Sequence, residues 1–174
     1  MEHSSIIDHY LAMPYWVIDI LPKQVPSNGR GQYFKIEGHF LKNPLFGAVC
    51  KKFSNVIIKL NCYCDISVCN ALDDCSDNPQ PEYIEECLSS GKAVYVVLKS
   101  EHAMIGFCGD DHYMTLYNPD ENLLELVSSL AHSEGLFVWK PVQKEKKHDG
   151  FTTDDLKEKG GTCDVDYIVG GYQG

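Results

Sequence analysis

The alternation of apolar and polar positions predicts a complete packing unit over Lys92–Pro141. Ala93–Leu98 is an unbroken apolar run of strand length, which is typical of a strand buried on both faces of a sheet. Ala103–Cys108 and His112–Tyr117 flank the turn-forming Gly109-Asp110-Asp111, so this pair predicts a β-hairpin. The strand and the hairpin together indicate an antiparallel sheet.

A helix is expected directly after the hairpin. Asn118 is typical of an N-cap, Pro119 suits the first helical position, and Gly135 lies where a helix would end. Leu136–Trp139 then predicts a last short strand. Between Asn118 and Gly135, the apolar residues keep helical spacing and form one stripe of Leu123, Leu124, Val127, Leu130 and Ala131. A sheet with a helix on one face is the α+β pattern.

The residues before Asn61 predict two helices and two less regular segments. Pro14 should end a short first helix, and Tyr15–Leu21 is an apolar segment that follows it. Gln32–Leu41 alternates only partly, which favours a strand or an extended arm. Leu45–Leu60 keeps its apolar residues at helical spacing and predicts the longest helix.

In the middle of the chain, the apolar positions change from helical spacing to every second residue. Asn61–Cys69 predicts a strand, and one of its faces would carry Cys62, Cys64, Ile66 and Val68. Leu72–Gln80 is polar and predicts a loop, whereas Pro81–Ser90 predicts a short helix ended by Gly91. We therefore expect an α+β fold in which an antiparallel-rich sheet packs with three or four helices.

The composition changes after Pro141, where a charged run begins. We expect one globular domain over residues 1–142 and a flexible or loosely docked C-terminal tail over residues 143–174. Within the tail, Gly160, Gly161 and Cys163 resemble the leader-to-core boundary of ribosomally made, modified peptide precursors. That resemblance implies that the tail is cut or modified; the alternatives are a simple terminus and a peptide that docks along a sheet edge.

The net charge of the chain favours some classes of binding partner and disfavours others. A formal net charge of −10 disfavours nucleic acid and anionic membranes, because both bind basic patches, and it favours a protein with a basic surface. A secretory signal pattern and a run of about 18 apolar residues are both missing, so we expect a cytoplasmic protein. The sequence also lacks a Walker loop and a GxGxxG motif, and we expect no cofactor.

The eight cysteines are expected to be reduced thiols, since disulfides are rare in the cytoplasm. Cys62, Cys64, Cys69 and Cys75 lie closest together in the sequence and are candidate zinc ligands or reactive thiols. Their spacing is not a paired C-x2-C arrangement. Packing in the core is therefore favoured, above all for the two cysteines on the predicted apolar face.

Two places suggest acid–base chemistry or binding. Asp19 interrupts an apolar segment, so its carboxyl is a candidate for a shifted pKa, although it could simply cap a backbone turn. Asp110, Asp111 and His112 bring two carboxylates and an imidazole together, although Gly-Asp-Asp is also ordinary hairpin chemistry. The turn would become a catalytic candidate only if another acid and a second histidine converged on it.

Three stretches of the domain resemble a known family. MPYWVIDILPKQVP, GDDHYMTLYNP and LLELVSSLAHSEGLFVWKP are similar to segments of a small, uncharacterised, single-domain family of bacterial proteins. The resemblance implies one domain and no reaction, cofactor or site residue.

These observations favour a non-enzymatic acidic module that binds another protein, in the manner of immunity or inhibitor proteins. One alternative is the recognition domain of a precursor whose tail is modified or cleaved. The other is a thiol- or metal-dependent enzyme that uses the four cysteines or the Asp110–His112 turn.

Overall fold

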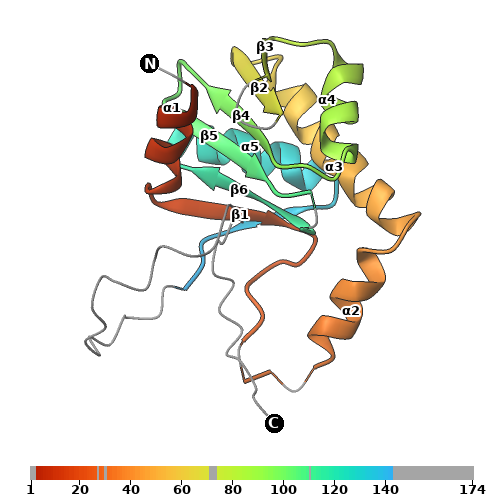
Figure 1. Ribbon diagram of the computed structural model, residues 1–174. Coiled ribbons are helices and arrows are strands. Elements are labelled where there is room, and N and C mark those ends of the chain that lie inside the picture. Colours follow the sequence, from red (N-terminus) through yellow and green to blue (C-terminus); the bar gives the residue numbers. More distant parts are fainter. Residues whose placement is uncertain (1–2, 27, 30, 71–73, 110, 143–174) are drawn as a thin grey trace, which may run out of the picture.

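The computed structural model describes residues 3–26, 28–29, 31–70, 74–109 and 111–142. These residues form five helices and one seven-stranded antiparallel sheet, which confirms the predicted α+β class (Figure 1). The helices are α1 (His3–Leu11), α2 (Tyr33–Phe40), α3 (Leu45–Leu60), α4 (Pro81–Ser89) and α5 (Glu121–Ser133). The strands are β1 (Tyr15–Asp19), β2 (Ile66–Asn70), β3 (Asp74–Asp77), β4 (Val94–Leu98), β5 (Ala103–Phe107), β6 (Tyr113–Tyr117) and β7 (Phe137–Trp139).

The strands lie in the order β3-β2-β4-β5-β6-β1-β7, and each pairing is antiparallel. The expected hairpin is the pair β5–β6. The register aligns Val68, Val96, Ile105 and Leu116 across four neighbouring strands, and all four side chains belong to the main core. Strand β4 is buried on both faces because helices cover both sides of the sheet, which explains its unbroken apolar run.

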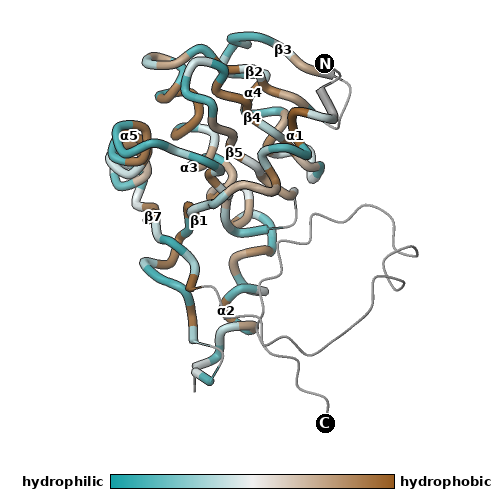
Figure 2. Tube along the Cα trace, turned by 90° about the vertical axis from the view of Figure 1, so that its left-hand side faces the viewer, coloured by the Kyte–Doolittle hydropathy of each residue, from teal (hydrophilic) through white to brown (hydrophobic). Residues whose placement is uncertain are grey.

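Helices α3, α4 and α5 pack on one face of the sheet and enclose the main core. On the opposite face, α1 places Ile7 and Tyr10 against Tyr95, Met104 and Tyr117. Figure 2 shows α1 and α5 on opposite sides of the strands. No helix within the described ranges has the length and apolar character that a membrane crossing requires.

Two segments differ from their predicted structure. Gln32–Leu41 was expected to be extended, but Tyr33–Phe40 forms α2. The expected loop Leu72–Gln80 contains the edge strand β3, which pairs with β2 through its backbone. Its polar composition is tolerated because an edge strand needs only one partner and keeps its other side in solvent.

The start of α5 is also shifted from its prediction. Asp120, not Asn118, is the N-cap, and its carboxylate accepts a hydrogen bond from the Leu123 amide at 2.8 Å. Asn118 has a left-handed backbone conformation and donates to the His102 carbonyl at 2.8 Å, so it shapes the preceding turn. Gly135 ends the helix with a φ of +70°, as predicted.

Candidate functional site

The structure brings Asp19 and His112 together at one end of the sheet. Asp19 is the last residue of β1, and its register partner on β6 is Tyr113, which directly follows His112. Nε2 of His112 lies 3.9 Å from Oδ1 of Asp19. Both residues were sequence candidates, but they came from separate candidate sites.

Helix α2 adds two side chains that the sequence interpretation missed. The Tyr33 hydroxyl donates to Oε1 of Glu37 at 3.1 Å and lies 3.4 Å from Nε2 of His112. Oε1 of Glu37 is 3.4 Å from Nδ1 of the same imidazole. We call Asp19, Tyr33, Glu37 and His112 the anchor cluster, because it joins α2 to the end of the sheet.

The geometry of α2 explains how these side chains meet. Tyr33 and Glu37 are four residues apart and therefore lie on one face of the helix. Phe40 continues that face by one turn and packs against the main core. The spacing of Tyr33, Glu37 and Phe40 was the one signal in the sequence that could have indicated a helix here.

The two members of the anchor cluster that lie at the end of the sheet are buried, whereas Tyr33 and Glu37 on α2 are half-buried. Asp19 is 0% exposed and His112 is 2% exposed. Oδ1 of Asp19 accepts a hydrogen bond from the Leu21 amide at 3.1 Å, whereas Oδ2 has no hydrogen-bond partner among the described residues. An unpartnered buried carboxylate oxygen is costly when it carries charge, and much less so when the carboxyl is protonated.

Burial shifts both titrating groups toward their neutral forms. It raises the pKa of Asp19 to about 7, and the nearby Glu37 adds to that rise, although amide hydrogen bonds from Leu21 and Ile20 oppose it. Burial lowers the pKa of His112, and Glu37 partly opposes that change. The distance of 3.9 Å would allow an ion pair, but both shifts favour a protonated carboxyl beside a neutral imidazole.

The predicted Asp-Asp-His site is described only in part. Asp110 lies outside the described residues. Asp111 is part of the hairpin turn, where its amide donates to the Cys108 carbonyl at 3.0 Å. The turn interpretation therefore describes Asp111, whereas His112 belongs to the anchor cluster. In the part of the chain that the structure describes, no three His, Cys, Asp or Glu side chains are grouped to hold a metal ion.

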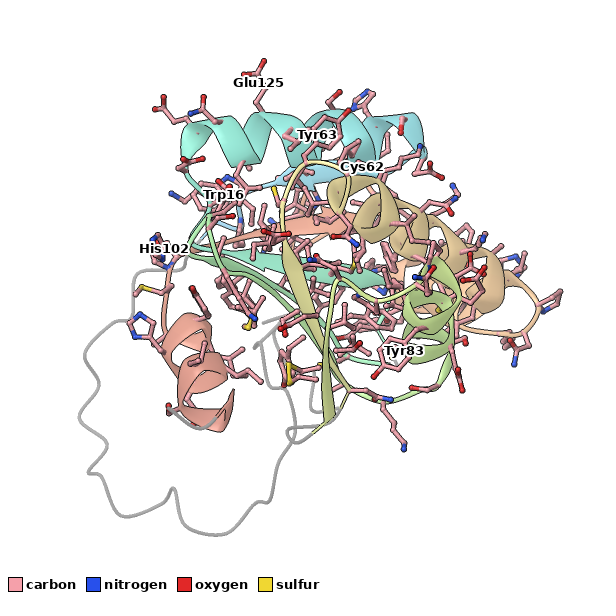
Figure 3. All side chains as sticks on the ribbon, turned by 90° about the horizontal axis from the view of Figure 1, so that it is seen from above. Trp16, Cys62, Tyr63, Tyr83, His102 and Glu125 are labelled. Carbon is pink, nitrogen blue, oxygen red and sulfur yellow. A yellow bond between two sulfur atoms is a disulfide. The ribbon has the colours of Figure 1, made fainter. Side chains whose placement is uncertain are left out.

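The four clustered cysteines are separated by the fold. Cys62 and Cys64 follow α3 in a turn and are not in the predicted strand; Cys62 is exposed, and Cys64 packs in the main core. Figure 3 shows Cys62 beside Tyr63 in this turn. Burial raises the pKa of the Cys64 thiol, and Glu101 and Asp65 add to the effect. The core prediction is confirmed for Cys64 and wrong for Cys62.

Cys69 and Cys75 form a disulfide, so the expectation of reduced thiols is wrong for these two residues. They are register partners on β2 and β3, and this pairing places their side chains next to each other. A disulfide is more common in oxidising compartments, and the cytoplasmic location therefore stays a prediction. Gly160, Gly161 and Cys163 lie outside the described residues.

We expect Cys75→Ser to lower the free energy of unfolding by about 2 kcal/mol, because the disulfide closes a short loop in the unfolded chain. Urea unfolding of oxidised protein measures the effect. Dithiothreitol should reduce the stability of the wild type by the same amount and leave the variant unchanged. A wild type that is insensitive to dithiothreitol would contradict the disulfide.

No family model matches the chain, and no curated protein or solved structure matches it either. The resemblance to a bacterial family stays a hypothesis, and the function must be argued from the site itself.

Proposed function

We propose that the protein is a protein-binding module and that α2 is its docking helix. The observation that carries the proposal is the exposure of this helix. None of its residues is fully buried, and Phe34 and Ile36 are 65% and 51% exposed. Only five large apolar side chains are exposed in the described part of the chain, and two of them lie on this one short helix.

The position of α2 supports the same proposal. The helix projects from the lower end of the molecule and does not cover either face of the sheet (Figure 1, Figure 2). An isolated helix of this length is marginal in water, so it needs tertiary contacts to persist. Tyr33, Glu37 and Phe40 supply those contacts on the inner side. The exposed residues Phe34, Lys35, Ile36 and His39 occupy the rest of the helix circumference, and we call this exposed side the α2 outer surface. Lys35 and His39 lie opposite the inner side, whereas Phe34 and Ile36 lie on its two flanks.

The charge around α2 differs from the charge of the whole chain. Residues 61–140 contain three Lys and fourteen Asp or Glu, a net charge of −11, whereas residues 1–60 contain seven Lys or Arg and four Asp or Glu, a net charge of +3. The expectation of a basic partner therefore rests on the later residues. On the α2 outer surface, Lys35 and His39 favour a partner segment that combines apolar side chains with carboxylates.

A photo-cross-linking amino acid at position 34 of the full-length protein tests the proposal in a lysate of the source organism. We expect a cross-linked protein that is identified by mass spectrometry and, once purified, binds the wild type. The double substitution Phe34→Glu and Ile36→Glu should weaken that binding more than tenfold, because buried anchor residues contribute most of the affinity of an interface.

Tyr63 provides the matched control. It is an aromatic residue with 68% exposure on the turn after the end of α3 (Figure 3), whereas α2 precedes the start of that helix. Tyr63→Glu should leave the binding unchanged. Equal losses from the two variants, or no protein cross-linked from position 34, would overturn the proposal.

A proton-transfer enzyme is the second candidate function. It is favoured by a carboxyl with a pKa of about 7 beside a neutral imidazole. Both side chains are buried, so a substrate would reach them only if α2 moved. Asp19→Asn separates the two candidates, since it should preserve binding at α2 and would remove the proton-transfer group.

A further inference from the structure

We propose that residues 163–169 of the same chain occupy the α2 outer surface in the free protein and compete with the partner for it. This inference rests on the proposed function, because it names a second ligand for the same surface. It is carried by the place where the described chain ends, the length of chain beyond that place, and the charges of the two segments.

The described chain ends beside the segment that leads to α2. Strand β7 pairs with β1, and the Val142 amide donates to Oε1 of Gln24 at 2.8 Å. Gln24 lies between β1 and α2 in the sequence. The last described residue is therefore attached to the loop that leads to the docking helix.

The chain beyond Val142 is long enough to reach α2. Residues 143–162 separate Val142 from the proposed ligand, and twenty residues can span up to about 65 to 70 Å when extended. Helix α2 itself is only about 12 Å long. A ligand on such a tether has an effective concentration near the millimolar range, so a contact with a millimolar dissociation constant would be occupied in a substantial fraction of molecules.

The composition of residues 163–169, CDVDYIV, complements the α2 outer surface. Tyr167-Ile168-Val169 is the only run of three apolar residues after Val142, and it can cover Phe34, the more exposed of the two apolar side chains on α2. Asp164 and Asp166 precede this run, and their negative charges complement the positive charge of Lys35. The segment has the combination of apolar and carboxylate groups that we inferred for an external partner.

Cross-linking of the purified full-length protein tests this inference without any partner. With the photo-reactive residue at position 34, peptide mapping should find adducts within residues 163–169. With the same residue at position 63, it should not. Mixing 15N-labelled and unlabelled protein distinguishes the source of the segment: adducts of single isotopic composition indicate the same chain, whereas mixed adducts would indicate a second copy and overturn the proposal.

Exchanging the charges of the two segments tests whether Lys35 contacts Asp164 and Asp166. Lys35→Glu should lower the yield of the adduct roughly fivefold, as expected for the loss of one exposed ion pair at the upper end of its range. Asp164→Lys combined with Asp166→Lys should restore the yield in the Lys35→Glu background and lower it in the wild type. Equal yields in all four proteins would contradict the proposed contact.

The two proposals fail in different ways. If position 34 cross-links to an external protein but never to residues 163–169, the docking function stands and the competition is wrong. If it cross-links to residues 163–169 and to no other protein, the internal contact stands and the docking function is wrong. Where both hold, the Asp164→Lys and Asp166→Lys variant should bind the partner more tightly than the wild type does.

Discussion

The Asp19→Asn variant is expected to be more stable than the wild type at pH 8, and its advantage should shrink by roughly 4 kcal/mol when the pH is lowered to 4. Burial raises the pKa of Asp19 from 3.8 to about 7 in the folded state, and each unit of difference corresponds to about 1.4 kcal/mol. Between these two values the folded protein holds a proton that the unfolded chain has lost. The stability of the wild type therefore falls as the pH rises through this window.

His112 has the opposite effect on the pH dependence of stability. The contribution of Asp19 is therefore isolated by comparing the Asp19→Asn variant with the wild type. Burial lowers the pKa of His112 below 6.5 in the folded state, so the unfolded chain binds more protons and stability rises with pH up to the unfolded value. In the wild type, the changes of stability with pH that Asp19 and His112 cause offset each other over the pH range in which both groups titrate. Asparagine cannot titrate, but its carbonyl oxygen can still accept the hydrogen bond from the Leu21 amide.

Urea unfolding at pH 4 and pH 8 measures the difference between the variant and the wild type. Asp8→Asn on α1 is the control, since Asp8 is exposed and its substitution should change stability by less than about 0.5 kcal/mol at either pH. A difference for Asp19→Asn that is the same at both pH values would show that the carboxyl is already ionised in the folded protein at pH 4.

Gly109→Ala is expected to lower the free energy of unfolding by about 3 kcal/mol, near the upper end for an overpacked site. A Cβ at this position would lie 2.1 Å from the carbonyl carbon of Gly91 and 2.5 Å from the amide nitrogen of Lys92. These atoms belong to the backbone, so they cannot move aside as a flexible side chain would. The link between β5 and β6 would have to separate from the turn before β4.

Gly47→Ala provides the matched control. Gly47 is an exposed residue of α3, and an added Cβ would meet no other atom within 4 Å. Alanine should stabilise this helix by about 0.5 to 1 kcal/mol, because it has the higher helix propensity. Urea unfolding of both variants at one pH measures the contrast. A Gly109→Ala protein as stable as the wild type would show that the two backbones are not in close contact.

Gly109 also shows how a correct prediction can rest on an incomplete reason. The sequence indicated a hairpin turn, and the hairpin is present. The glycine was expected for its backbone freedom, but its φ is outside the left-handed region. The structure needs a glycine there because the backbone of Gly91 and Lys92 lies against it, just beyond the paired residues of β4 and β5. A close approach between neighbouring strands leaves no trace in the local sequence.

The sequence by itself determined the elements whose signals are local. The apolar run of β4, the helical spacing of α3 and α5, Pro81 at the start of α4 and Gly135 after α5 are all found within a few neighbouring residues. The signals failed where an element was short or stabilised from outside. Helix α2 is too short for its period to be recognised, and β3 is a polar strand held by its pairing with β2.

The same division applies to the candidate site. The sequence identified Asp19 as a polar group among apolar neighbours and His112 as an imidazole next to two carboxylates, and it established the total charge. Only the tertiary structure decided that these two residues meet, that α2 contributes Tyr33 and Glu37, and that α2 exposes Phe34. These outcomes depend on the pairing of β1 with β6, which lie far apart in the chain. Such pairing is set by the burial and hydrogen bonding of the whole sheet, which no short stretch of sequence encodes.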